Sequence, residues 1–90
     1  MKKEIEDFRS QINKVDEALF QELIMRFDIV QEINQYKEVR DIPVESKMRE
    51  SILLERANQL LEDTEFKEYI INVYIEIIKQ SKKYQKNNRG

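Results

Sequence analysis

Apolar residues recur at helical spacing along the N-terminal part of the chain. At about 100° per residue these positions fall within a sector of roughly 80°, which makes one continuous stripe. They are Ile5, Phe8, Ile12, Val15, Leu19, Leu23, Val30 and Ile33. Because neither Gly nor Pro interrupts the segment, the pattern predicts one very long helix over about residues 3–39. Pro43 follows and cannot continue a helix.

Two shorter helices are predicted after the proline. Ser46 is a good N-cap residue and is expected to start a helix over about residues 46–61. Asp63 and Thr64 offer another cap for a third helix over about 64–86. The apolar face expected for the third helix carries Phe66, Ile70, Val73, Ile77 and Tyr84.

The chain as a whole is predicted to form a single all-α domain, residues 1–90. Glu, Lys, Gln, Arg, Leu and Ile dominate the composition, and Pro43 and Gly90 are the only proline and glycine. The last residues, 86–90, are polar and are expected to form a frayed tail.

The long helix is too long to bury its own stripe. At about 1.5 Å per residue it extends for roughly 50 Å. A compact chain of 90 residues has a radius of gyration of about 12 Å, so its diameter is much smaller than the length of this helix. Two short helices of the same chain cover only part of the stripe. We therefore expect a homodimer built around the long helices, with twofold symmetry as the commonest arrangement.

Charge and composition limit the ligands and the catalytic groups that this chain could use. The 16 basic and 18 acidic residues leave a net charge of −2, which provides no general attraction to nucleic acid or to an anionic membrane. The chain has no Cys and no His, so it lacks disulfides, the commonest general base and the commonest metal ligand. We expect no metal or cofactor. No signal peptide or apolar span of ~20 residues is present, which favours the cytoplasm.

Two cations lie inside the apolar sector of the long helix. Arg26 and Lys37 fall on the same line as Leu19 and Val30, so both are expected to point inward. A buried unpaired charge costs several kcal/mol, so each requires an anionic partner. The two residues are three helical turns apart, or ~16 Å along the axis. A small organic acid would fit between their long side chains.

Other polar residues join this inward face. Ser81 and Gln85 continue the stripe of the third helix, while Arg49 and Glu50 lie near the start of the second. Together they predict a cavity that is cationic overall. Each residue also has a plainer interpretation, such as neutralisation of Arg26 by Glu50 at an interface. Spacing alone leaves both interpretations open.

The order of these residues resembles that of the all-helical (AroQ-type) chorismate mutase family. The matching positions are Arg9, Asp16, Arg26, Lys37, Pro43-Val44, Arg49-Glu50, Ser81 and Gln85. The resemblance extends from about Phe8 to Gln85, with one residue fewer around Asp63. It implies a three-helix protomer, an intertwined homodimer with two equivalent sites, and the intramolecular Claisen rearrangement of chorismate to prephenate for Phe and Tyr biosynthesis.

The resemblance also implies roles for the residues that would bind the dianionic substrate. Arg26 and, from the partner subunit, Arg9 would hold its two carboxylates. Lys37 and Gln85 would donate hydrogen bonds to its ether oxygen, and Ser81 belongs to the same site. No cofactor or metal is implied.

Three further positions lie near the start of the second helix. Glu50 would accept a hydrogen bond from the ring hydroxyl, and Arg49 would shape the local field and position Glu50. Ser46 stands where the family often has Asp. Both residue types cap helices well, and the resemblance leaves open whether Ser46 contacts the hydroxyl.

Two alternatives remain. Isochorismate pyruvate-lyase, which forms salicylate and pyruvate, shares this fold and much of the cationic site, although Glu50 favours chorismate. The other alternative is a non-catalytic helical dimer with an interaction or regulatory role, for which Leu53, Leu54 and Leu61 would offer a surface. The intact set of polar residues argues against loss of the site.

Overall fold

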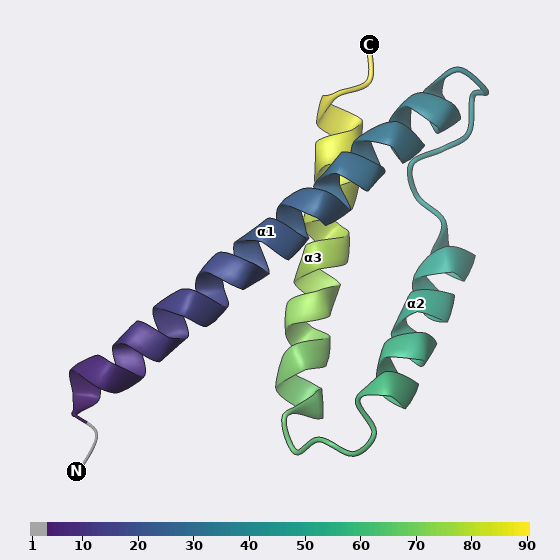
Figure 1. Cartoon of the computed structure of the whole chain (residues 1–90). Helices are drawn as coiled ribbons and strands as arrows, with labels where there is room; N and C mark the ends of the chain where they lie inside the picture. The colour runs from purple at the N-terminus through teal and green to yellow at the C-terminus, as the bar shows by residue number, and fades with distance from the viewer. Residues whose placement is uncertain (1–3) are drawn as a thin grey trace.

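The computed structural model describes residues 4–90, and three helices make up most of this range. Helix α1 spans Ile5–Glu38, α2 spans Lys47–Leu60 and α3 spans Lys67–Asn87 (Figure 1). No strand occurs in residues 4–90. The predicted all-α class with a very long first helix is confirmed, although the expected start at residue 3 lies outside the described residues.

Local chemistry defines both ends of α1. At its start, Asp7 Oδ2 accepts a hydrogen bond from the backbone N–H of Glu4 at 2.9 Å. This bond satisfies a donor that the helix itself leaves free. Beyond the other end, Asp41 adopts the left-handed conformation with φ 56°, which short polar side chains tolerate better than most. With Pro43 following, the chain leaves the helix in a tight turn and returns toward α2.

The two shorter helices differ in how well their starts match the sequence pattern. Ser46 caps α2 as predicted, because its Oγ accepts a hydrogen bond from the N–H of Arg49 at 3.2 Å. The expected start of the third helix at residue 64 is wrong, since α3 begins at Lys67. Thr64 Oγ1 instead accepts from the N–H of Phe66 at 3.2 Å. Such a local turn competes with helix formation.

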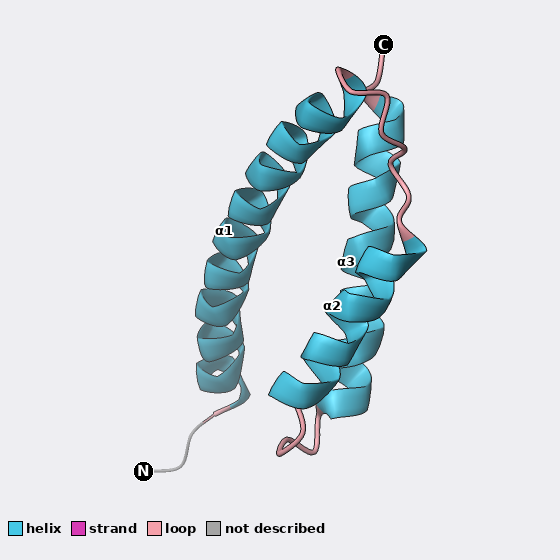
Figure 2. Ribbon diagram, turned by 90° about the vertical axis from the view of Figure 1, so that its right-hand side faces the viewer, coloured by secondary structure: helices cyan, strands magenta, loops and turns pink. Residues whose placement is uncertain are grey.

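Helix α3 lies between the other two. Within residues 4–90, α1 and α2 each pack against α3 but not against each other. Figure 1 shows α1 crossing α3 and extending beyond it, with α2 next to α3, and in the turned view of Figure 2 α2 lies in front of α3. The protomer measures 60 × 27 × 14 Å and has a radius of gyration of 16.9 Å. This exceeds the ~12 Å of a compact chain of the same length.

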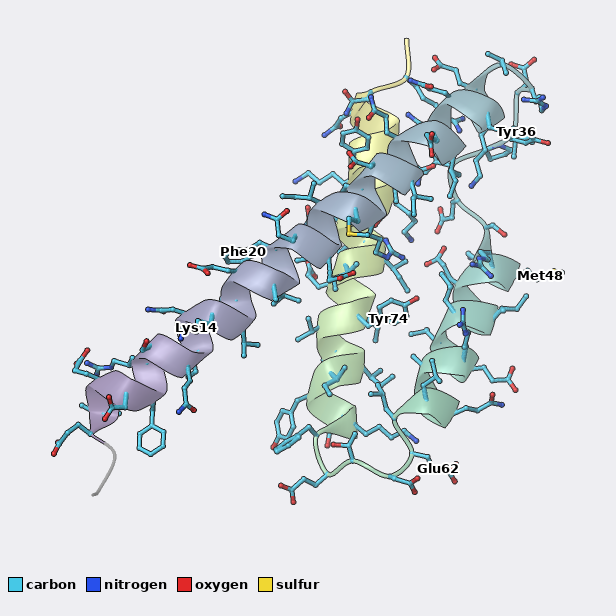
Figure 3. The ribbon with its side chains drawn as sticks, viewed as in Figure 1. Lys14, Phe20, Tyr36, Met48, Glu62 and Tyr74 are labelled. Carbon is cyan, nitrogen blue, oxygen red and sulfur yellow. The ribbon has the colours of Figure 1, made fainter. Side chains whose placement is uncertain are left out.

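Very little apolar surface is buried within one protomer. In the described residues, the buried hydrophobic side chains are Val30 of α1 and Ile78 of α3. Figure 3 shows Lys14 and Phe20 on a part of α1 with no other element beside it. The stripe residues in this half of the helix are all exposed, namely Ile5, Phe8, Ile12, Val15 and Leu19. One chain thus leaves the N-terminal half of its stripe uncovered, and burial of that half by a second copy stays a prediction.

The apolar face expected for the third helix is only partly correct. Its early residues Phe66 and Val73 are 57% and 59% exposed. The buried residues are Ile78, Ser81 and Gln85. Because α1 crosses only the C-terminal half of α3 (Figure 1), α1 does not cover the first half of the expected face.

The expectation of a frayed tail over residues 86–90 is wrong. Helix α3 continues to Asn87, and Arg89 then folds back onto α1. Its Nε donates to Asn34 Oδ1 at 2.9 Å, and its Nη1 donates to the carbonyl of Ile42 at 2.7 Å. Asn34 is 3% exposed, and its Nδ2 donates to the carbonyl of Gln85 at 3.2 Å. A buried amide needs such partners, so the tail is tied to the body of the protein.

Replacing Arg89 with methionine is expected to lower the free energy of unfolding by about 1–3 kcal/mol, because the buried Asn34 oxygen loses its donor. Methionine retains much of the aliphatic length. The matched control is Lys86→Met, an exposed position in the last turn of α3, which should change stability by less than about 0.5 kcal/mol. Urea unfolding at one fixed protein concentration measures both. Equal midpoints for the two variants would contradict the role given to Arg89.

Candidate active site

A pocket opens where α1 and α2 diverge on either side of α3. Its volume is about 630 Å³, which falls in the range of small-molecule sites. All of the predicted site residues except Arg9 line it, namely Arg26, Lys37, Ser46, Arg49, Glu50, Ser81 and Gln85. The rest of the wall is largely apolar and comes from all three helices and the 39–46 linker. Residues far apart in the chain therefore meet around one hollow.

Arg26 is held in place by neutral groups. Its Nη1 donates to Ser81 Oγ at 2.7 Å, and that hydroxyl donates in turn to the carbonyl of Ile77 at 2.7 Å. The ring of Tyr74 lies 5.9 Å from the guanidinium carbon, close enough for a cation–π contact. These contacts fix the side chain without neutralising its charge.

Lys37 is held in a similar way at the opposite side of the pocket. It lies in the last turn of α1, and its Nζ donates to the carbonyl of Val44 in the linker at 3.2 Å. The residue as a whole is half-buried. Since a lysine ammonium carries three hydrogens, two of its donors remain without a protein acceptor among residues 4–90.

Three cations at this pocket lack a carboxylate partner. Among residues 4–90, no acidic side chain or chain terminus lies within 4.0 Å of the charged nitrogens of Arg26, Lys37 or Arg49. Glu50 does not neutralise Arg26, the plainer interpretation that spacing had left open. Its Oε1 instead pairs with Lys82 Nζ at 3.0 Å.

Lys82 and Glu45 belong to the pocket wall but were not identified from the sequence. The ammonium of Lys82 lies 3.0 Å from Glu50 Oε1 and 3.5 Å from Glu45 Oε1. The hydrogen bond to Glu50 raises the pKa of Lys82 above its ordinary value, and the negative charge of Glu45 adds to the effect. Lys82 follows the buried Ile78 by about one helical turn, so the two residues share a face of α3. That spacing could have placed Lys82 at the pocket from the sequence.

Two buried oxygens at the pocket receive no hydrogen bond from the part of the chain that the structure describes. They are Glu50 Oε2 and Gln85 Oε1. Gln85 is 7% exposed, and its Nε2 donates to the carbonyl of Ser81 at 3.3 Å. Leaving a buried polar atom unpaired costs about 1–3 kcal/mol, so such atoms mark places that call for a functional explanation.

Arg9 is the one predicted site residue that the structure does not bring to the pocket. It lies near the N-terminal end of α1, the part that extends away from α2 and α3 (Figure 1). Its Nη1 forms an exposed ion pair with Glu6 Oε1 at 2.7 Å. Within its own chain, Arg9 therefore cannot contribute to the site.

The arrangement suits a small, doubly negative molecule. Its unpaired cations and spare donors surround a largely apolar hollow, where electrostatic contacts are stronger than in water. In residues 4–90 there is no group of three or more acidic side chains placed to hold a metal ion. None of the helices within these residues is long and apolar enough to cross a membrane.

Comparison with known proteins identifies the family. The sequence model of the family described as chorismate mutase type II matches residues 8–86, which is nearly the whole chain. No curated protein and no solved structure gives a significant match.

Proposed function

The chain belongs to the chorismate mutase type II family and is an isomerase-type enzyme; from this premise we propose that it converts chorismate to prephenate in the pocket between α1 and α2. One observation carries the proposal. Arg26, Lys37 and Arg49 line a single pocket and have no carboxylate partner in the described residues. A dianionic substrate would supply the missing negative charge, because an unpaired cation in a half-buried position, as at Arg26 and Lys37, is otherwise costly.

The reaction needs little from the protein in the way of reactive groups. In the rearrangement one C–O bond breaks and one C–C bond forms within the same molecule, so no nucleophile, metal or proton transfer takes part. A chain without His or Cys can therefore perform it. The protein must hold the flexible substrate in a chair-like near-attack conformation. Arg26 serves this purpose by binding a carboxylate in the bidentate manner typical of guanidinium groups.

Lys37 and Gln85 would stabilise the transition state. As the C–O bond breaks, negative charge grows on the ether oxygen, and preorganised donors favour that change. Each side chain already donates one hydrogen bond to a backbone carbonyl, Lys37 to that of Val44 and Gln85 to that of Ser81. Each retains at least one further N–H. The existing bonds thus orient the two donors and leave them free to bind the oxygen.

The start of α2 would bind the ring hydroxyl. Glu50 lines the pocket half-buried, and its carboxylate can accept a hydrogen bond from that hydroxyl. Arg49 precedes it and supplies positive charge at the pocket rim. The Oγ of Ser46 already accepts from the N–H of Arg49. Its own hydroxyl hydrogen remains available, so a contact with the substrate is part of the proposal.

The complete site would require two copies of the chain. The exposed stripe on the first half of α1 is too long for the protomer to cover, and a twofold dimer is the commonest way to bury such a surface. Arg9 lies in that half of α1, away from its own pocket. In an intertwined dimer Arg9 of the partner subunit would bind the second substrate carboxylate. We place this activity in the cytoplasm, in the synthesis of Phe and Tyr.

The proposed function is tested by following the loss of chorismate absorbance and identifying the product. The expected product is prephenate, formed without added metal or cofactor. A parallel reaction with isochorismate tests the lyase alternative. Strong pyruvate release from isochorismate, with no prephenate from chorismate, would overturn the assignment. Failure to act on either substrate would favour a non-catalytic dimer.

The rate is expected to depend only weakly on pH. Gln85 carries no titrating group, and the raised pKa of Lys82, caused mainly by its hydrogen bond to Glu50, keeps this ammonium charged at alkaline pH. We expect kcat/KM to change by less than about threefold between about pH 5 and 9, the range flanked by the reference values of Glu and Lys. A pH series at constant ionic strength measures this, and a bell-shaped profile centred in that range would contradict it.

The raised pKa of Lys82 also makes the stability of the fold depend on pH. A lysine pKa raised in the folded protein stabilises the fold fully below its unfolded value of 10.5. That contribution is lost as the pH rises through the folded value.

A further inference from the structure

Lys82 forms a three-residue cluster with two acids from a different part of the chain. It lies on α3, Glu50 lies in the first turn of α2, and Glu45 lies in the linker just before α2. The ammonium is 3.0 Å from Glu50 Oε1 and 3.5 Å from Glu45 Oε1. The side chains of Lys82 and Glu50 are 25% and 26% exposed, so the closer contact is partly shielded from water. All three residues line the pocket.

The cluster divides the charges of the pocket into two groups. Six charged residues line it, with Glu45 and Glu50 as the two acids and Arg26, Lys37, Arg49 and Lys82 as the four cations. Both acids lie within ion-pair distance of the same cation, Lys82. The other three cations are left without a carboxylate among residues 4–90.

We propose that Lys82 is a positioning residue that holds Glu45 and Glu50 away from the unpaired cations and so lets the pocket bind a dicarboxylate. This inference rests on the proposed function for the identity of the ligand. In this role Lys82 would touch neither the reacting atoms nor the substrate carboxylates. Lys82 acts through the two acids and mainly increases the affinity of the pocket for the substrate.

The physical reason is competition for the same cations. A carboxylate released from Lys82 would be free to pair with Arg49 or Arg26, which are the groups needed for the ligand. It would also repel a doubly negative substrate across a pocket of low polarity, where charges act strongly. The raised pKa of Lys82, caused first by its hydrogen bond to Glu50, agrees with an ammonium that both acids hold in its charged form.

The first test compares Lys82→Met with Lys83→Met. Lys83 is the next residue on α3, is exposed and does not line the pocket. Lys82→Met should raise KM for chorismate by about tenfold, equivalent to about 1.4 kcal/mol, with kcat changed by less than about threefold. Lys83→Met should leave both constants near the wild-type values. Equal KM values for the two variants would overturn the proposal.

Two further variants separate a charge effect from a packing effect. Lys82→Arg keeps the positive charge and should retain a KM within about threefold of the wild type. Glu45→Gln, added to Lys82→Met, removes one of the released negative charges and should recover a large part of the lost affinity. A residue that only supported the fold would not be rescued by a change that adds no contact. If Glu45→Gln left the KM of Lys82→Met unchanged, the charge mechanism would be wrong.

A direct measurement keeps this inference separate from the proposed function. Glu50 is the partner that raises the pKa of Lys82 most. NMR titration of protein carrying labelled lysine should therefore show a lower pKa for Lys82 in the Glu50→Gln variant than in the wild type. If the wild type failed to convert chorismate, the proposed function would fall. The titration and the binding of prephenate as a dicarboxylate probe would still decide the role of Lys82. An unchanged titration of Lys82 in Glu50→Gln would overturn the ion cluster itself.

Discussion

Replacing Lys37 with alanine is expected to lower kcat/KM by roughly 10²–10³-fold, the loss seen when a preorganised donor to a developing oxyanion is removed. Lys37 is half-buried and lines the pocket, and its ammonium is oriented by the carbonyl of Val44 at 3.2 Å. Alanine removes both the charge and the donor, and water in the vacated space would have to reorganise during the reaction. Most of the loss should fall on kcat, because the interaction strengthens in the transition state.

The matched control for this prediction is Lys14→Ala. Lys14 also lies on α1 (Figure 3), but it is exposed and does not line the pocket of its own chain. Initial rates over a range of chorismate concentrations, with circular dichroism to confirm helix content, compare the two variants. If Lys37→Ala folded normally and kept kcat/KM within about threefold of the wild type, Lys37 would have no catalytic role.

A mixture of Arg9→Ala and Arg26→Ala chains is expected to be far more active than either variant alone. Each variant by itself lacks one of the two arginines in every site, so each should lose most of its activity. In a mixed dimer, the site on the Arg9→Ala chain has its own Arg26 and receives an intact Arg9 from the other chain. The second site lacks both. Random exchange makes about half of the dimers mixed, so about a quarter of all sites regain both arginines.

The experiment requires subunit exchange, so the chains are mixed at equal concentration, partly unfolded together and refolded before the assay. Sedimentation should show species containing two chains in every sample. A mixture of Arg26→Ala with Lys37→Ala is the control, because both residues line the pocket of the same chain. In that mixed dimer each site retains a defect, so recovery should be absent. Recovery in neither mixture would rule out a site shared between subunits.

Part of this site was predictable because a helix converts sequence spacing into direction. Arg26 and Lys37 share the angular position of Leu19 and Val30, so their inward orientation followed from the repeat of the helix alone. The cap at Ser46 was equally local, since it depends on one side chain and a backbone N–H three residues later. Gln85 and Ser81 continued an apolar stripe, and both are buried.

Other parts depend on which helix crosses which, and spacing contains no such information. The pairing of Lys82 with Glu50 joins residues on α3 and α2. The bond from Arg89 to Asn34 likewise depends on where the end of α3 meets α1. For the same reason, the apolar face of α3 was misassigned at Val73, which is exposed.

The sequence by itself determined the three helices and the set of polar residues that face inward. It also determined that the apolar stripe of α1 is longer than one chain can cover. These follow from local propensity and from a period of 3.6 residues, which act over a few turns. Only the tertiary structure decided that both acids of the pocket pair with Lys82, so that Arg26, Lys37 and Arg49 remain without carboxylate partners in the described residues. Ion pairs between helices depend on distances across the packing, and those distances exist only once the helices are placed.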